Sequence, residues 1–445
     1  MSSVAIIGTG IAGLGCAHFL QREHDLTLFE ARDHVGGHAH TVDAYESADD
    51  ASGARSRLVP IDTGFTVFNK VTYPHLTRLF EQLQVPLQRT ALSFGVRHAV
   101  SGLEYGSGSL NRLFAQRGNL LRPRHWRFRA AIQRFNAEAA ASLDDPATPN
   151  ETLADYVRRR GYGADFFDLY LVPLASALWH TPPELLLDFP AAMLLRFFHL
   201  HGFVGRGTQH AWWTVEGGAK TYLARLTAPF QDRIRLNQAA TRVIRTPRGV
   251  TVMTASGSAQ SFDKVILACR ADQALRLLVN ATPAETAALS PFRSQTITAT
   301  VHTDTAVMPR TRRAWSAWNH EIARNKHGEL STATHYWMNR LQGVSDRAHY
   351  FVSLGRPEAI AKEKVIRRVE FEHPLFTLAA VRAQAEIPVL NHHATGATET
   401  YFAGAWQRFG FHEDGLLSAV QLCTQLLGRD PWTEPGSEPA TTAHA

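Results

Sequence analysis

A glycine-rich turn close to the start of the chain constrains the fold more than any other feature. Residues 8–13 read G-T-G-I-A-G; they follow the apolar segment 4–7 and precede residues 11–21, whose apolar positions recur at helical spacing. In such a strand–turn–helix unit, glycines allow a tight turn, a close approach of backbone to pyrophosphate, and close helix–strand packing. The start of the helix also offers free N–H groups to phosphate. The pattern therefore predicts a dinucleotide-binding βαβ unit.

An acidic residue and a second pair of glycines indicate which dinucleotide is bound. Glu30 lies 17 residues after Gly13, at the end of a second strand predicted over residues 26–29. A carboxylate at this place binds the ribose hydroxyls and repels the 2′-phosphate of NADP. Gly36 and Gly37 follow six residues after Glu30. A nicotinamide dehydrogenase does not need this pair, whereas a flavoprotein lets the extended chain pass beside the pyrophosphate and ribityl groups, so FAD is the predicted cofactor.

Strand-like and helical segments alternate along the rest of the chain. Strands are predicted over residues 59–68, 236–244, 250–254, 262–268, 296–302, 349–354 and 400–403. Residues 73–202 have a mostly helical pattern, a last helix is predicted over 415–427, and the small, polar residues 44–57 indicate an exposed loop. Nucleotide-fold signals thus occur at the start, the middle and the end of the chain.

This alternation predicts an α/β fold with two intertwined domains. The first is a discontinuous, two-layer Rossmann-type FAD-binding domain over residues 1–72, 210–275 and 395–429. The second is an inserted α+β substrate domain over residues 73–209 and 276–394. Residues 430–445 are rich in Pro, Gly, Ser, Thr and Glu, and we expect them to form a disordered tail.

Composition excludes several other classes of protein. The chain has 445 residues, enough to bury a large core without disulfides. Cys16, Cys269 and Cys423 stand far apart, which argues against a thiolate metal site and a disulfide framework and fits a reducing cytoplasm. There is no export signal, and no apolar run approaches the ~20 residues of a membrane-spanning helix. We expect a cytoplasmic protein without a bound metal, at most peripheral on the inner face of the membrane.

One segment concentrates the positive charge of the chain, whose formal net charge is +6. Residues 105–137 contain no acidic residue but contain seven arginines between Arg112 and Arg134, interleaved with Leu, Trp and Phe. The segment is either a solvated helix face or a surface that meets anionic phospholipid, because arginine and Trp side chains suit a membrane interface. No motif indicates nucleic acid as a partner.

The sequence resembles the flavin-containing amine oxidase and phytoene desaturase superfamily. It is most similar to bacterial FAD-binding proteins related to the N-terminal domain of plant cyclopropane-fatty-acid synthases. The matching stretches are residues 4–42, 61–69, 213–222, 263–268 and 403–420. The first stretch is highly specific for FAD, and the others are moderately specific.

The resemblance implies a cofactor site that is spread over the chain. The glycine turn would hold the pyrophosphate, Glu30 and its neighbours the adenosine ribose, Val243 the adenine through its backbone, and the last helix would lie beneath the flavin. The implied cofactor-binding residues are Gly8, Gly10, Ile11, Ala12, Gly13, Glu30, Ala31, Arg32, Gly36, Gly37, His38, Gly64, Phe65, Val243, Ala268, Gly404, Glu413, Asp414, Gly415 and Leu416. His38 stands where many relatives have Arg, and Ala405 where many have an acid, a role that passes to Asp414 in this chain.

Candidate catalytic residues follow from the same resemblance. His412 lies in the loop that reaches the flavin, and Asn69 and Tyr73 follow a strand that comes near it. His180 lies among aromatic residues of the substrate domain and is either a general acid–base group or a satisfied polar residue at the edge of an apolar cavity. A metal site at His34, His38 and His40 is disfavoured, so that no metal is predicted.

Three functions fit these features. The first is an FAD-dependent oxidoreductase that desaturates, saturates or isomerises an unsaturated or methyl-branched fatty acyl chain, because the substrate domain is rich in Phe, Trp and Leu and suits an apolar ligand. The second is an amine oxidase that releases peroxide. The third is a non-catalytic flavin-binding partner of a lipid methyltransferase, for which another lipid-modifying enzyme would be the partner.

Overall fold

A parallel sheet formed by segments from the start, middle and end of the chain organises the first of two units. The computed structural model describes residues 1–47, 55–205, 208–325 and 327–433. Unit 1 contains residues 1–37, 226–290 and 383–445, and unit 2 contains residues 38–225 and 291–382. Residues 434–445 of the expected disordered tail lie outside the described residues.

All neighbouring strands of the five-stranded sheet in unit 1 are parallel. Parallel strands are buried on both faces and are therefore almost wholly apolar, as Val4, Ala5 and Ile6 illustrate with no exposed surface. The strand order is β10 (Ile234–Arg235), β2 (Asp25–Phe29), β1 (Ser3–Ile7), β14 (Lys264–Leu267) and β20 (Thr400–Phe402). This sheet confirms the predicted α/β class and Rossmann-type domain.

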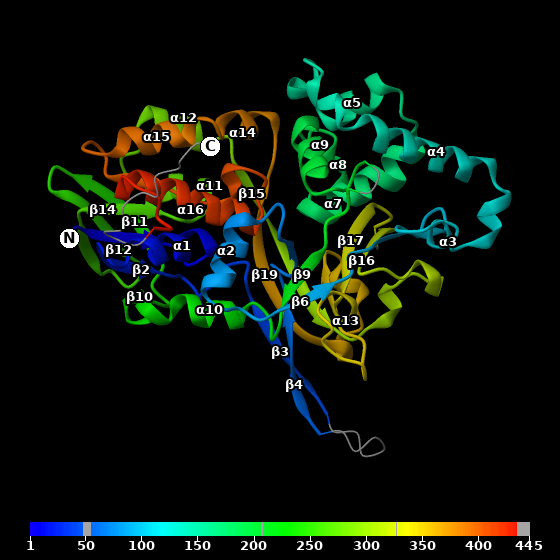
Figure 1. The fold of residues 1–445 in the computed structure, drawn as a ribbon, viewed down its shortest axis with the longest axis horizontal. Helices are drawn as coiled ribbons and strands as arrows, with labels where there is room; N and C mark the ends of the chain where they lie inside the picture. Colours follow the sequence, from blue (N-terminus) through cyan, green and yellow to red (C-terminus); the bar gives the residue numbers. More distant parts are fainter. Residues whose placement is uncertain (48–54, 206–207, 326, 434–445) are drawn as a thin grey trace, which may run out of the picture. The chain divides into compact units, whose positions relative to one another are not determined.

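Helices and a small antiparallel sheet complete unit 1. Helix α1 (Ile11–Leu20) packs against α16 (His412–Leu427), and Figure 1 shows the two beside each other. The antiparallel sheet consists of β11 (Ala240–Thr246), β12 (Gly249–Thr254) and β13 (Ala259–Phe262). Further helices are α11 (Ala271–Leu277), α12 (Pro283–Leu289) and α15 (Glu386–Ala394), whereas α10 (Lys220–Thr227) and α14 (Leu378–Ala383) span the unit boundaries.

A seven-stranded mixed sheet organises unit 2. All its neighbours are antiparallel except β16 and β7. The order is β19 (Val365–Leu375), β15 (Arg293–His302), β18 (Phe351–Leu354), β17 (Leu330–Trp337), β16 (Trp318–Arg324), β7 (Phe94–His98) and β8 (Leu103–Gly106). Smaller sheets are the pair β3 (Thr41–Glu46) and β4 (Arg57–Asp62), and the trio β5 (Phe68–Asn69), β9 (Trp212–Val215) and β6 (Leu87–Thr90).

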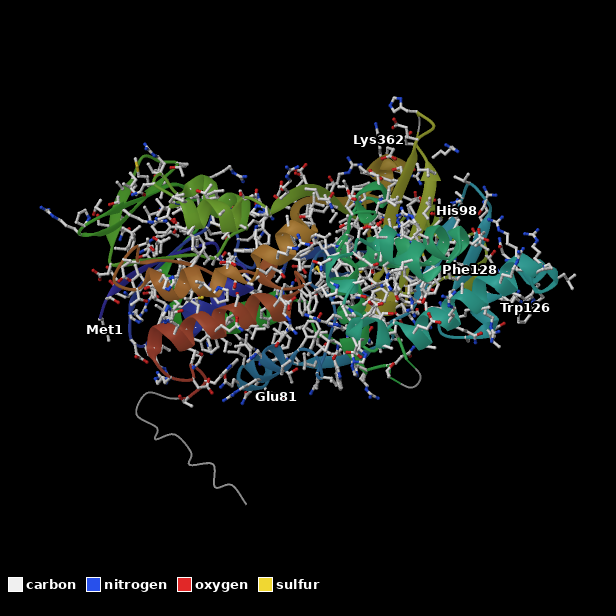
Figure 2. All side chains as sticks on the ribbon, turned by 90° about the horizontal axis from the view of Figure 1, so that it is seen from above. Met1, Glu81, His98, Trp126, Phe128 and Lys362 are labelled. Atoms are coloured by element: carbon white, nitrogen blue, oxygen red, sulfur yellow. The ribbon has the colours of Figure 1, made fainter. Side chains whose placement is uncertain are left out.

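Several helices of unit 2 share an aromatic core. On α4, Phe128 is buried in this core while Trp126 is 43% exposed (Figure 2). The helices are α2 (Pro74–Gln82), α3 (Leu110–Leu113), α4 (Pro123–Glu138), α5 (Leu153–Arg160), α6 (Ala164–Phe166), α7 (Val172–Trp179), α8 (Pro183–Leu186), α9 (Ala191–Leu200) and α13 (Met338–Leu341). Within the described ranges, no helix has the length and apolarity needed to cross a membrane.

One local prediction was wrong, and another was incomplete. Residues 44–46 and 57 belong to the β3–β4 pair rather than to a loop, because Ala44 packs with Val59 in the core under the seven-stranded sheet; residues 48–54 of that loop lie outside the described part. The mostly helical segment 73–202 contains the strands β6, β7 and β8. The buried residues Phe94 to Val96 and the turn at Gly102, with φ of +72°, accompany the β7–β8 hairpin.

Candidate functional site

The three glycines of the first turn play different roles. A Cβ at Gly8, whose φ is +102°, would lie 2.7 Å from the carbonyl oxygen of Ala268, and a Cβ at Gly13 would lie 2.0 Å from that of Gly8. These two positions therefore exclude side chains because the backbones pack closely. A Cβ at Gly10, in contrast, would meet no atom within 4 Å. Gly10 thus leaves open space directly before helix α1, where a phosphate can approach the backbone.

The second glycine pair lies against this turn. The Gly36 N–H donates to the Thr9 carbonyl oxygen at 2.9 Å. A Cβ at Gly37, whose φ is +59°, would lie 3.2 Å from the Cα of Gly10. The chain after Glu30 therefore passes along the open side of the turn, as the spacing of the two motifs predicts for a flavoprotein.

Glu30 holds the turn in place through both carboxylate oxygens. Its Oε2 accepts from the Thr9 backbone N–H at 3.0 Å and from the Thr9 hydroxyl at 2.5 Å, and its Oε1 accepts from the Arg32 N–H at 3.0 Å. Oε1, which accepts one of these bonds, retains a further lone pair for a hydroxyl group. Ala31 and Arg32 follow directly at the end of the strand and line the same corner.

The starts of two helices lie together beside the turn. A Cβ at Gly415, in the first turn of α16, would lie 2.7 Å from the Cγ2 of Ile11, the first residue of α1. Ala12, one residue further along α1, and Leu416 of α16 are both buried in unit 1. Both helices present unsatisfied N–H groups and the positive end of a dipole at one place. This arrangement, together with the space at Gly10, fits the pyrophosphate of FAD.

The entry to α16 contains the buried acidic residues Glu413 and Asp414. Burial raises the pKa of Asp414 to about 7, although the N–H of Phe411 donates to its Oδ2 at 2.9 Å. Arg408 lies 3.6 Å from the Asp414 carboxylate. Asp414 therefore carries a proton in part of the molecules at neutral pH. His412, the first residue of α16, is 9% exposed at the same helix start.

Residues that directly follow the neighbouring strands β14 and β20 also belong to this corner. Gly404 donates its N–H to the Ser418 hydroxyl at 2.9 Å, and a Cβ there would lie 2.3 Å from the Trp406 indole nitrogen. That indole donates to the Cys269 carbonyl oxygen at 3.0 Å, directly after Ala268. Trp406 therefore ties the ends of β14 and β20 together, a contact that the glycine motifs alone do not indicate.

Val243, which the resemblance implies for the adenine, lies on β11 of unit 1, and that role stays a prediction. It is fully buried in the three-stranded sheet, and its carbonyl oxygen accepts from the Val279 N–H at 3.1 Å. The residues that meet the ribose corner are Asn237 and Gln238, whose N–H groups donate to the carbonyl oxygens of Arg32 and Glu30 at 2.9 and 2.8 Å. This segment was not predicted, because residues 236–239 have a strand-like pattern, whereas β11 begins at Ala240.

The remaining implied cofactor residues belong to unit 2. The Phe65 N–H donates to the His38 carbonyl oxygen at 2.9 Å, and a Cβ at Gly64 would lie 2.2 Å from the same oxygen. The His38 ring stacks on Phe371 with centroids 5.1 Å apart and meets His373 at 4.8 Å. Across the described ranges, no group of three His, Cys, Asp or Glu residues is arranged to hold a metal ion.

Asn69 and Tyr73 have structural partners in unit 2. Asn69 is fully buried; its Oδ1 accepts from the N–H groups of Val71 and Thr72, and its Nδ2 donates to the Thr72 hydroxyl at 2.8 Å. Tyr73 precedes α2, is 3% exposed, and packs against Phe68. Asn69 thus organises the turn before α2, and a catalytic role for these two residues stays a prediction.

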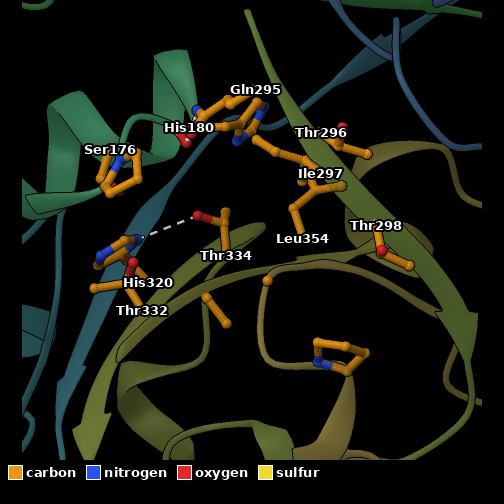
Figure 3. Close-up of a pocket in the computed structure, with 14 residues that line it drawn as sticks. Ser176, His180, Gln295, Thr296, Ile297, Thr298, His320, Thr332, Thr334 and Leu354 are labelled. Carbon is orange, nitrogen blue, oxygen red and sulfur yellow. Dashed lines mark hydrogen bonds between the residues drawn. The ribbon is translucent and has the colours of Figure 1, made fainter. Parts of the chain in front are cut away.

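A cavity of about 320 Å³ opens in the seven-stranded sheet where one strand stops. Strand β18 pairs with both β15 and β17 but ends at Leu354, so the sheet has no middle strand beyond this residue. The end of α7 contributes to the same space (Figure 3). The lining residues are Ser176, His180, Pro182, Gln295, Thr296, Ile297, Thr298, His320, Thr332, Ala333, Thr334, Leu354, Gly355 and Pro357.

The two histidines of the cavity are neutral. Burial, helped by the neighbouring His38, lowers the pKa of His180 to about 3. Burial, helped by His335, lowers the pKa of His320 to about 3. The His320 Nδ1 lies 3.2 Å from the Thr334 hydroxyl (Figure 3), while its buried Nε2 has no hydrogen-bond partner among the described residues. None of the described residues that line the cavity is Asp, Glu, Lys or Arg.

The aromatic residues that suggested an apolar cavity form a helical core instead. Trp179 packs against Phe189 and Phe197 with ring centroids 4.8 and 5.0 Å apart. Phe166 packs against Phe135 at 5.2 Å. The described cavity lining contains hydroxyl, amide and imidazole groups between its aliphatic residues and no Phe, Trp or Tyr.

Comparisons with known proteins agree with an FAD-binding fold. The sequence model of one family, flavin containing amine oxidoreductase, matches residues 11–427. A search of curated proteins gives no significant match.

Similar solved structures include a CLA-producing fatty acid isomerase from P. acnes, which is 16% identical with a TM-score of 0.64. The matched region covers 95% of this chain and 98% of the isomerase chain. Cyclohexylamine oxidase from Brevibacterium oxydans IH-35A is 15% identical with a TM-score of 0.63, covering 96% and 99%. Putrescine oxidase bound to putrescine is 13% identical with a TM-score of 0.64, covering 96% and 99%. Identities this low show a shared fold.

Proposed function

Because the chain belongs to the flavin containing amine oxidoreductase family and is an FAD-dependent oxidoreductase, we propose that it acts on an uncharged part of its substrate. The preferred substrate is an unsaturated or methyl-branched fatty acyl chain that is desaturated, saturated or isomerised. FAD, when bound, supplies the hydride acceptor or donor for this chemistry. The protein contributes the binding of FAD, the position of the chain and a site with little water.

The residues of unit 1 fit FAD by their chemistry. The N–H groups at the starts of α1 and α16 would hold the pyrophosphate, and Glu30 would accept from the ribose hydroxyls. Gly10 leaves the space that the phosphate needs. Asp414, whose pKa burial raises to about 7, offers a carboxyl group that donates or accepts a hydrogen bond at the opening of α16.

The cavity in unit 2 is the observation that carries the substrate class. A buried ammonium ion needs a partner, because an unpaired charge away from water is very costly. The described lining offers no carboxylate, and its two histidines are neutral. Aliphatic side chains of Ile297 and Leu354 and the hydroxyl groups of threonines suit an uncharged chain better than an amine.

The shared fold supports this choice without deciding it. A fatty acid isomerase has the same fold as this chain, and so do two amine oxidases. Amine oxidation is therefore the second candidate, which the family description and these two structures favour. The charge-free lining supports the first candidate, since an amine would have to lose its proton before entering.

A matched pair of substrates tests the proposal. Methyl oleate and oleylamine have the same carbon chain and differ in the group at its end. We expect the flavin absorbance of the anaerobic holoprotein to bleach with methyl oleate, or the double bond to move or change in number when the product is analysed by gas chromatography. In a parallel aerobic assay, where dioxygen reoxidises the reduced flavin and water hydrolyses the imine, aldehyde, ammonia and peroxide formed from oleylamine alone, with methyl oleate unchanged, would instead establish amine oxidation.

A further inference from the structure

An exposed apolar cluster in unit 2 has no role in the cofactor site or the cavity. Leu110, Leu120, Leu121 and Trp126 are 58%, 45%, 88% and 43% exposed, and all lie within 17 residues of sequence, from the first residue of α3 to the first turn of α4. Single exposed apolar residues are ordinary, but a group of large ones on one segment marks an interaction surface. We call these four residues the apolar cluster.

The apolar cluster rests on a fixed local structure. The Trp126 indole donates to the Leu120 carbonyl oxygen at 2.9 Å, which joins the start of α4 to the preceding turn. The Trp126 ring also packs on Phe114 with centroids 4.9 Å apart, and Phe114 itself is buried. Leu120 and Trp126 are therefore held together on a supported platform.

Seven arginines lie in or beside the same stretch of sequence, residues 112–134, and their partners divide them into two groups. Arg112 donates to the Trp315 carbonyl oxygen and the Ser316 hydroxyl, Arg124 pairs with Asp165, and Arg134 pairs with Glu138. These three arginines stabilise the unit itself. Arg124 is therefore a poor residue through which to test surface charge.

The second group has no carboxylate partner among the described residues. Arg117 donates to Asn111 and to the Phe114 carbonyl oxygen, and Arg122 donates to Asn119, which are all uncharged acceptors. Arg129 lies over the Trp126 ring at 5.5 Å, and Arg127 has only a longer-range interaction with Asp165. Uncompensated positive charge thus borders the apolar cluster.

We propose that this surface docks the protein on anionic phospholipid. Leucine side chains and a Trp ring enter the boundary between headgroups and acyl chains, while arginines at the same depth pair with phosphate. The combination of a positive border with an apolar centre distinguishes a membrane from a neutral protein partner. The proposal is independent of the substrate, although docking would place the enzyme beside acyl chains.

Co-sedimentation of the holoprotein with vesicles tests the proposal. We expect binding to vesicles of equal parts phosphatidylglycerol and phosphatidylcholine, and little binding to pure phosphatidylcholine. The double variant Leu121→Ser/Trp126→Ser and the double variant Arg122→Glu/Arg127→Glu should each lower the bound fraction by about tenfold or more. High salt should weaken the binding of wild type, because exposed charges are screened.

Matched controls separate docking from general surface effects. Leu330→Ser removes another leucine, which is 59% exposed, and Arg248→Glu reverses an exposed arginine elsewhere; both should bind like wild type. Bound flavin in each variant shows that it is folded. Absence of binding to the anionic vesicles at low salt would overturn the proposal, and so would a dimer that Leu121→Ser/Trp126→Ser converts to monomer without any vesicle binding.

Discussion

The nucleotide turn of unit 1 and the cavity of unit 2 are built in opposite ways. The turn relies on backbone atoms that approach closely because Gly8 and Gly13 lack side chains. The cavity relies on side chains of strands that separate where β18 ends at Leu354. A backbone site depends on a short run of sequence, whereas a cavity in a sheet depends on strands from distant parts of the chain.

The largest expected effect tests the backbone site. Gly13→Ala would place a Cβ 2.0 Å from the Gly8 carbonyl oxygen, so the turn must move. We expect the affinity of the variant for FAD to fall by more than about a hundredfold, which corresponds to ~3 kcal/mol. Flavin fluorescence, measured while the apoprotein is titrated with FAD, checks this.

Gly10→Ala and Gly118→Ala sharpen this prediction. Both would place a Cβ in open space within the described structure, but only Gly10 lies where a phosphate would approach. We expect Gly10→Ala to unfold at the wild-type temperature without FAD and to bind FAD more weakly. Gly118→Ala should match wild type in both measurements, and equal FAD binding by all three variants would remove the turn from the cofactor site.

The same contrast explains what could be predicted from the sequence. The turn, Glu30 and Gly36–Gly37 lie within 30 residues, and their spacing alone predicts the corner that the structure shows. The last strand and the last helix could be predicted because residues 403–420 resemble the corresponding stretch of the flavoprotein superfamily.

Positions that depend on packing between distant segments were less accessible. Asn237 reaches the ribose corner because its φ is +56°, which a strand-like pattern does not reveal. The cavity lining combines α7 with β15, β16 and β17, and no local pattern indicates that β18 is short. Apolar and aromatic content indicated a core, but it could not indicate which part of that core is hollow.

We expect acid to lower the free energy of unfolding more through the buried histidine of the cavity than through an exposed histidine. Burial lowers the folded-state pKa of His320 to about 3, while the unfolded imidazole takes its proton near its ordinary value of 6.5. Its stabilising contribution is therefore present above pH 6.5 and is lost as pH falls, by about 2 kcal/mol at pH 5. Urea unfolding of wild type and His320→Gln should show the variant losing less stability across this range.

His392→Gln is the matched control, because His392 is exposed on α15 of unit 1. It should follow the wild-type curve between neutral and acid pH. Parallel curves for wild type and His320→Gln would show that His320 takes up its proton in the folded state, and the cavity would not be neutral under mildly acid conditions.

The smallest effect concerns selectivity and bears most directly on the cavity. Thr332→Asp places a carboxylate in a lining that has none among its described residues, whereas Thr332→Val keeps the shape and removes the hydroxyl. If the lining selects uncharged chains, Thr332→Asp should lower kcat/KM for methyl oleate by about tenfold and raise turnover of oleylamine, because the new charge pairs with an ammonium group. Thr332→Val should change both substrates alike and by less. Should Thr332→Asp leave the ratio of the two substrates unchanged, the substrate does not occupy this cavity, and selectivity must come from another part of the molecule.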